Sequence, residues 1–246
     1  ETVSISGTDP SNSTTVVNAA QPNSSFMGTA YDSDNGFVVV TYALNSDSDL
    51  KTSVMRAAEG FQAQGYNIGY DTSNNNIVIF YADTITKVKA ISHNTSNGTY
   101  TAVSSPTILN TSNLGNSKNA DVVFDPDTNR TIVAYLDNTN NNATVNVVQT
   151  GGTAASPTVT VGSDVLLDSG DQGGTVSLSY DTTNNKVFVA YLNGTDDLIK
   201  GAIGTVTAGT NAISFAGHAT VWDPSSGNIT QFAQVFDDDK DKVMFF

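Results

Sequence analysis

One short pattern occurs five times in the sequence, and this repetition limits the possible folds more than any other feature. An aromatic residue is followed by Asp, a short polar turn and a run of mostly β-branched residues. Successive copies are separated by roughly 40 to 55 residues, and self-similarity at such a spacing predicts a repeat architecture built from similar sheets. The aromatic–Asp pairs are Tyr31-Asp32, Tyr70-Asp71, Phe124-Asp125, Tyr180-Asp181 and Phe236-Asp237, and a Tyr recurs at the same distance after each of the first four Asp residues, at Tyr42, Tyr81, Tyr135 and Tyr191.

Each repeat predicts a hairpin of two antiparallel strands. The Asp that opens the turn can accept backbone N–H bonds, and Asn or Gly near its end tolerates positive φ. The strand after the turn is apolar at consecutive positions, whereas a sheet with one wet face would alternate. We therefore expect sheets that are covered on both faces. The five apolar runs are Val38–Val40, Ile77–Ile79, Ile132–Ala134, Val187–Val189 and Val243–Phe245.

Weaker runs predict a third and an outer fourth strand in most repeats. We expect an all-β fold, a single β-propeller domain over residues 1–246 with five four-stranded blades, each packed between two neighbours. The units start near residues 26, 66, 120, 176 and 232. The third strands are expected at Leu50–Val54, Val88–Ile91, Val145–Val148 and Leu198–Ile203, and the fourth at Thr107–Leu109, Val165–Leu167 and Ala219–Trp222.

The two ends of the sequence look like complementary parts of one unit. Residues 1–19 contain Thr2–Ser6 and Thr15–Val17, which resemble third and fourth strands, whereas residues 232–246 resemble a first and a second strand. These parts could form one closing blade, so that residues 1–19 complete the last unit. They could also pair between chains and build a filament, or the sequence could be a segment of a longer repeat protein.

Composition excludes several classes of partner. The net charge is −14, with 24 acidic and 10 basic residues, so we expect neither nucleic-acid binding nor attraction to anionic membranes. No apolar run is long enough for a membrane helix, and we expect no membrane insertion. Helical periodicity is nearly absent, with Ser53–Gln64 as a short, broken candidate. Cysteine is absent, which rules out a disulfide framework.

The sequence offers few residues for catalysis, and we expect a protein that is not an enzyme. Its two histidines, His93 and His218, fall in different repeats. A glycoside hydrolase needs a pair of carboxylates, one of them protonated as a general acid, and the only glutamates are Glu1 and Glu59. We therefore name no catalytic residue, and glycoside hydrolysis is the weakest of the functions considered.

Two acidic turns are candidate calcium sites, and no other cofactor is expected. Asp32 with Asp34, and Asp237 with Asp239, place carboxylates at alternate positions, as in the opening of a calcium-binding loop. The alternative is that the first Asp of each pair caps a hairpin turn.

Nine Asn-x-Ser/Thr sequons are candidates for glycosylation if the protein follows a secretory route. About six would be expected by chance from the Asn, Ser and Thr content, so nine is a mild excess. The nine positions are Asn12, Asn23, Asn94, Asn97, Asn110, Asn129, Asn142, Asn193 and Asn228.

The later repeats resemble a known group of proteins. The stretch from Tyr180 to Tyr191, followed by Gly201–Val206 and Ile213–Phe215, is similar to repeats in tail-fibre-like and other virion-associated proteins of aquatic phages, and in uncharacterised secreted bacterial proteins. The resemblance implies a structural or adhesive role on an extracellular or virion surface, and it carries over no catalytic residue. The short first repeat departs from the pattern and leaves the number of blades open.

From the sequence we expect a non-enzymatic building block of an extracellular or virion appendage, such as a fibre or filament subunit. It would associate with itself or with neighbouring structural subunits, through complementary terminal strands. The alternative is a lectin-like propeller that binds surface glycans, with the recurrent tyrosines as aromatic platforms, although their place at the end of an apolar strand favours core packing.

Overall fold

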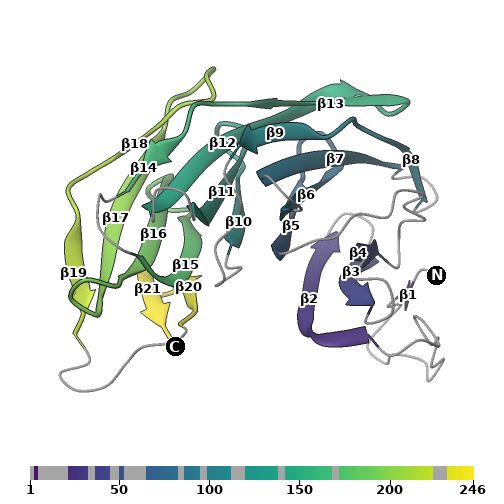
Figure 1. Ribbon diagram of the computed structural model, residues 1–246. Coiled ribbons are helices and arrows are strands. Elements are labelled where there is room, and N and C mark those ends of the chain that lie inside the picture. The colour runs from purple at the N-terminus through teal and green to yellow at the C-terminus, as the bar shows by residue number, and fades with distance from the viewer. Residues whose placement is uncertain are drawn as a thin grey trace.

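The computed structural model describes residues 3–4, 22–32, 37–44, 50–52, 65–82, 86–94, 99–111, 120–137, 142–167, 172–223 and 232–246. These residues form an all-β structure of antiparallel sheets without a helix, as the sequence predicted (Figure 1). In the same ranges no helix has the length and apolarity needed to span a membrane.

The strands form four sheets and a C-terminal hairpin, in chain order. The first sheet contains β1 (Val3–Ser4), β2 (Pro22–Asp32), β3 (Phe37–Leu44) and β4 (Leu50–Thr52), and the second contains β5 (Gly65–Asp71), β6 (Asn76–Ala82), β7 (Thr86–Asn94), β8 (Thr99–Val103) and β9 (Thr107–Asn110). The third sheet contains β10 (Ala120–Asp125), β11 (Arg130–Asp137), β12 (Asn142–Thr153), β13 (Ser156–Val161) and β14 (Val165–Leu166). The fourth contains β15 (Gln172–Asp181), β16 (Lys186–Asn193), β17 (Leu198–Val206), β18 (Ile213–Phe215) and β19 (Ala219–Trp222), and the hairpin consists of β20 (Gln234–Asp237) and β21 (Lys242–Phe245).

Each repeat places its Asp at the hairpin turn between the first and second strands. The backbone conformation and hydrogen bonds of these turns are those that the sequence predicted. The residue four positions after the Asp is left-handed in four repeats, at Asn75, Asn129, Asn185 and Asp241. In the same repeats one carboxylate oxygen accepts the backbone N–H groups of the residues two and three positions later, as between Asp181 Oδ1 and the N–H groups of Thr183 and Asn184, at 3.0 and 2.9 Å.

The fourth strand is longer than the sequence predicted. The predicted segments correspond to β9, β14 and β19, but each is the second half of an outer strand whose first half is β8, β13 or β18. Both halves pair with the same third strand: β12 pairs with β13 through residues 148–153 and with β14 through residues 144–145. An irregularity between the halves bends the outer strand without ending it.

The sheets stack through their first strands, so that β2, β5, β10, β15 and β20 lie in succession. Apolar clusters fill the spaces between neighbouring sheets. One joins Val78, Phe80 and Leu109 of the second sheet to the third, a larger one joins the third sheet to the fourth, and a smaller one joins the fourth to the hairpin. Every residue of β11 is buried, which confirms that a strand apolar at consecutive positions is covered on both faces.

Over the described ranges, the stacked sheets do not close into a ring. Figure 1 shows an open arc, with the first sheet at one end and β20 and β21 at the other. The expectation that residues 1–19 complete the last unit is not met at Val3–Ser4, because β1 pairs with β3. There β1 pairs with Phe37 and Val38 of β3, whereas β4 pairs with Thr41–Ala43 further along the same strand. Thr15–Val17 and Ser53–Gln64 lie outside the described residues.

Candidate functional site

Three of the four recurrent tyrosines are core residues. Tyr81, Tyr135 and Tyr191 are all buried, at 2, 0 and 0% exposure, and Tyr135 stacks against Phe80 of the second sheet with ring centroids 5.5 Å apart. The side chain of Tyr42 lies outside the described part. A buried ring cannot serve as an open stacking platform for a sugar, so these three positions favour packing over carbohydrate recognition.

The hydroxyl groups of two of these tyrosines tie the second strand to outer parts of the same sheet. Tyr135 Oη donates to Asn146 Oδ1 at 2.8 Å, and Asn146 Nδ2 in turn donates to Asp164 Oδ1 at 2.8 Å. Burial raises the pKa of the Tyr135 phenol far above its ordinary value, with the Asp164 charge as a smaller cause. The phenol is therefore a neutral donor at any physiological pH.

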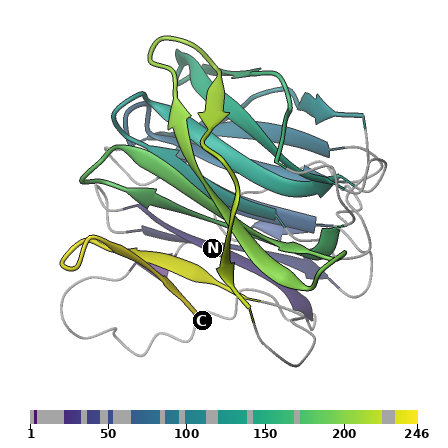
Figure 2. The ribbon, with the colours of Figure 1, turned by 90° about the vertical axis from the view of Figure 1, so that its left-hand side faces the viewer.

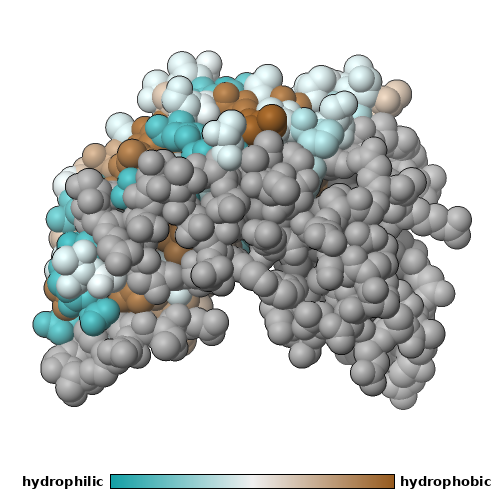
Figure 3. Space-filling model, in the orientation of Figure 1, coloured by the Kyte–Doolittle hydropathy of each residue, from teal (hydrophilic) through white to brown (hydrophobic). Residues whose placement is uncertain are grey.

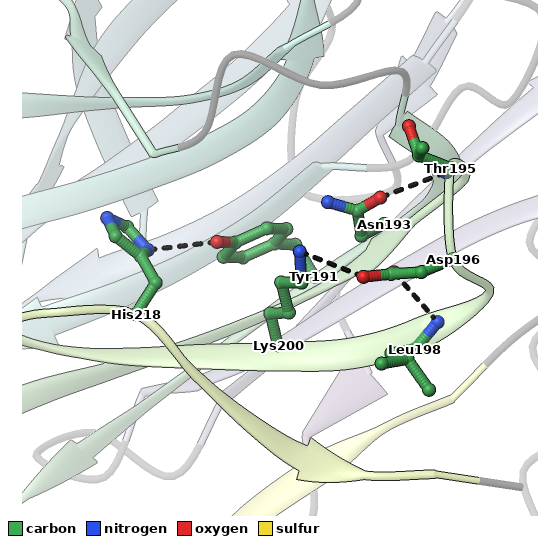
Figure 4. A network of polar contacts seen from close by, with 7 residues as sticks. All are labelled: Tyr191, Asn193, Thr195, Asp196, Leu198, Lys200 and His218. Carbon is green, nitrogen blue, oxygen red and sulfur yellow. Dashed lines mark hydrogen bonds and ion pairs between the residues drawn. The ribbon is translucent and has the colours of Figure 1, made fainter.

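The corresponding hydrogen bond in the fourth sheet joins a tyrosine to a histidine. Among the polar contacts of the described residues, this group of side chains most resembles a catalytic site. Tyr191 Oη and His218 Nδ1 lie 2.9 Å apart, and Figure 4 shows the phenol directed at the imidazole, while Lys200 and Asp196 form an ion pair at 3.1 Å beside it. His218 is exposed, and its partner is a buried phenol. Nucleophilic catalysis needs a nucleophile next to a base that is itself oriented by a carboxylate. The side chains of this group do not form that combination, and we interpret their contacts as structural bonds between strands.

A buried carboxylate on the inner strands links three sheets, and sequence reasoning missed it. Asp121 Oδ1 accepts from Asn67 Nδ2 of the second sheet at 3.2 Å and from its own neighbour Val122 N–H at 2.9 Å. Asp121 Oδ2 accepts from Ser177 Oγ at 3.0 Å and from Leu178 N–H at 2.7 Å, both of the fourth sheet. Asn67, Asp121 and Ser177 occupy the same position ahead of the Asp of their repeat, and a polar residue at this point of an apolar strand was the available signal.

The chemistry around Asp121 is that of a structural tie. Burial raises the pKa of this carboxyl, whereas the four hydrogen bonds lower it, and burial is the larger effect. Every partner is a donor, and each oxygen already accepts two hydrogen bonds, so the carboxylate has no free position for a substrate. Gln234 ties the hairpin to the fourth sheet in a similar way, since its Nε2 donates to the carbonyl oxygens of Ser177 and Phe188, both at 3.0 Å.

The candidate calcium residues are placed as follows. Asp237 Oδ1 accepts the N–H groups of Asp239 and Lys240, at 3.1 and 3.2 Å, which is the capping role named as the alternative. Asp239 is exposed in the same turn. Asp32 ends β2 and Asp34 lies outside the described residues. Across the described ranges, no three His, Cys, Asp or Glu side chains are grouped to hold a metal ion.

The nine sequons fall in different surroundings. Asn129 lies in a turn, Asn110 is partly buried and donates to Asp164, and Asn142 and Asn193 are buried at the ends of strands. Asn129 is therefore the best placed of these four to carry a glycan. Asn23 and Asn94 lie in β2 and β7, with side chains outside the described part, and Asn12, Asn97 and Asn228 fall outside the described residues.

One apolar face at the end of the stack is uncovered. We use "trailing face" for the side of a sheet turned towards the next sheet along the chain. In the third sheet the trailing face is covered by the fourth, and Val147 and Leu167 are 1 and 3% exposed. In the fourth sheet Ile203 and Trp222 occupy the corresponding positions and are 48 and 49% exposed.

The correspondence of these positions follows from strand pairing. Val147 pairs with Ile132, and Ile203 pairs with Phe188, the equivalent residue of the next repeat. Leu167 N–H donates to Ala143 O, and Trp222 pairs with Ile199, which stands one repeat after Ala143. We call Ile203, Val221 and Trp222 the open face; Figure 2 views β17 and β19 from this side, and Figure 3 shows hydrophobic and hydrophilic residues mixed along the same edge.

The hairpin covers only the inner half of the fourth sheet. Phe232 and Phe245 pack with Ala190, Leu192 and Ile199, and the Phe188 and Phe245 rings meet edge to face at 6.0 Å. Neither β20 nor β21 pairs with a strand of another sheet in the described part of the chain. The outer half, which carries Ile203 and Trp222, therefore stays in contact with solvent.

Comparison with known proteins adds no family assignment. No protein-family model matches the chain, and no curated protein matches it significantly.

Proposed function

We propose that this chain is a non-enzymatic structural or adhesive building block, and that its stacked sheets are blades of a β-propeller-like repeat. Its setting would be an extracellular or virion appendage, such as a fibre or filament, where it contacts copies of itself or neighbouring structural subunits. The observation that carries the proposal is the repeated stacking of similar sheets through buried apolar strands, which builds a scaffold from equivalent units.

The use of polar residues supports the same proposal. The repeat Asp residues cap turns, Asp121 ties three sheets together, and the tyrosine hydroxyls join strands within a sheet. These carboxylates and phenols of the described part, which could act as acids or bases in an enzyme, are thus engaged in structural hydrogen bonds. Glycan recognition through the recurrent tyrosines is disfavoured by their burial.

Light scattering after size-exclusion chromatography, combined with electron micrographs of the same fractions, tests this function. We expect concentration-dependent oligomers or filaments of the purified chain. A glycan array serves as the comparison, with little binding expected. A chain that stays monomeric at every concentration and binds a defined glycan would replace the building-block proposal with the lectin alternative.

A further inference from the structure

The turn between β16 and β17 resembles the turns that the repeat Asp residues cap, but it opens with an asparagine. Asn193 Oδ1 accepts the N–H of Thr195, two positions later, at 2.9 Å (Figure 4). The residue four positions after Asn193, Asp197, is left-handed with a φ of 55°. Asp181 holds its own turn in the same way, so the amide of Asn193 occupies the place of a capping carboxylate.

This turn brings the side-chain amide of Asn193 next to the backbone nitrogen of Gly194. A hydrogen bond from Oδ1 to the N–H two positions later folds the side chain back over the intervening peptide, so that Cγ lies close to the nitrogen of that peptide. Within the described part of the chain, the Gly194 N–H donates to no acceptor, and glycine has no side chain to obstruct the approach. The nitrogen and the amide carbon are therefore neighbours before any reaction starts.

We propose that Asn193 is a self-modification site, which converts to aspartate in the folded protein. The Gly194 nitrogen forms a bond to Cγ of Asn193, the bond from Cγ to Nδ2 breaks, and ammonia leaves with the proton that the Gly194 nitrogen gives up. The product is a cyclic imide. Water then opens the ring at one of its two carbonyl carbons, which yields either aspartate or isoaspartate, whose backbone runs through Cγ. The reaction consumes only water.

Burial of Asn193 favours this route over modification by an enzyme. Asn193 belongs to a sequon, but its side chain is 3% exposed, so a transferase has no access to the amide in the folded chain. The intramolecular attack needs only the adjacent nitrogen. The turn residues Thr195, Asp196 and Asp197 are exposed, and water therefore reaches the imide from the turn side.

The fold has a place for the carboxylate that results. One repeat earlier, Asp137 occupies the corresponding position, two residues after the recurrent tyrosine, and it is 1% exposed. In four repeat turns a carboxylate oxygen accepts the N–H groups two and three positions later. An aspartate at residue 193 can accept the same pair, from Thr195 and Asp196. Isoaspartate instead lengthens the backbone and disturbs the pairing of residue 193 with Leu198.

Peptide mapping after incubation in water enriched in heavy oxygen tests the inference. The folded protein is incubated at mildly alkaline pH and then digested with trypsin in ordinary water, so that only the incubation introduces label. Cleavage after Lys186 and Lys200 releases a peptide with a single asparagine and no glutamine. We expect this peptide to gain one heavy oxygen atom at residue 193. Gly194→Ala should slow the uptake about tenfold or more, because a side chain hinders the approach of the nitrogen.

A sample unfolded in urea is the matched reference, because it keeps the sequence and loses the turn. Labelling of the folded sample, slowed by Gly194→Ala, supports the inference. A folded sample that stays unlabelled while the unfolded sample reacts to completion overturns it, since the fold would then protect Asn193.

Asn193→Asp tests the proposed product separately. The variant supplies the carboxylate without the reaction, and we expect its melting temperature to equal or exceed that of the wild type, because the turn gains a stronger acceptor. A clearly lower melting temperature would overturn the assignment of this residue as a capping aspartate.

Discussion

Replacing Tyr135 with Phe tests the conclusion that the recurrent tyrosines belong to the core. The substitution removes only the hydroxyl, which donates to Asn146 Oδ1 at 2.8 Å, and both residues are fully buried. Asn146 cannot turn its amide to compensate, because Nδ2 is held by Gly162 O at 3.2 Å and by Asp164 Oδ1 at 2.8 Å. A buried acceptor is thus left without its donor, which costs about 1–3 kcal/mol of unfolding free energy.

Tyr191→Phe is the matched control, since it removes the same hydroxyl one repeat later. Its partner there is the ring of His218, which is exposed and can bond to water instead. We expect a loss of about 0.5–1.5 kcal/mol, the usual net value of a hydrogen bond whose partner is resolvated. Urea titrations followed by circular dichroism give both values. A Tyr135→Phe loss equal to or smaller than the Tyr191→Phe loss would falsify the reasoning from burial.

Three further predictions concern the turns and the inner tie. Asn185 has a φ of 55°, so Asn185→Ala should lower the unfolding free energy by about 1 kcal/mol while Asn185→Gly stays within a few tenths; equal losses in thermal melts would contradict this. Asp125→Ala removes the acceptor of two turn N–H groups and of the Thr128 hydroxyl and should cost about 1–3 kcal/mol, with Asp125→Asn in between, as measured in urea. Burial raises the pKa of Asp121, so its contribution to stability is fully present below the ordinary pKa of 3.8 and is lost as the pH rises through the folded-state pKa. The unfolding free energy of the wild type relative to Asp121→Asn should therefore fall as the pH rises above the ordinary pKa of 3.8, and a constant difference would argue against the burial effect.

Local chemistry made the hairpins predictable from the sequence. The Asp that caps each turn, the left-handed residue four positions later and the apolar run of the second strand are all short-range features, and the structure confirms them in four repeats. The predicted third and fourth strands also fall inside β7, β12 and β17, and inside or next to β9, β14 and β19.

The missed elements depend on longer-range interactions or on weaker patterns. The segments that form β8, β13 and β18 are short and rich in Thr and Ser, so they lack the dense apolar runs that identified the inner strands. Ser156–Val161 does alternate, with Pro157, Val159 and Val161 on one side, and this period of two was the signal available. Asp121 was missed because its partners, Asn67 and Ser177, belong to the repeats before and after its own.

The arrangement of the ends was beyond sequence reasoning for a physical reason. Repeat spacing specifies which strands belong to one sheet, but the rotation between neighbouring sheets depends on how their side chains pack. The length of the repeat therefore does not specify how many sheets would complete a ring. The short first repeat adds to this, since β1 pairs with β3 where a longer third strand would otherwise lie.

Stacking through first strands has a consequence for how such chains can change in length. Each apolar cluster of the described residues joins two adjacent sheets, so gain or loss of one repeat module by unequal recombination would create the same kind of junction on either side. The nearly constant interval between the last four repeat Asp residues fits such duplication. Relatives of different length should accordingly differ by whole modules, with their boundaries in the connections that lead into β5, β10, β15 and β20.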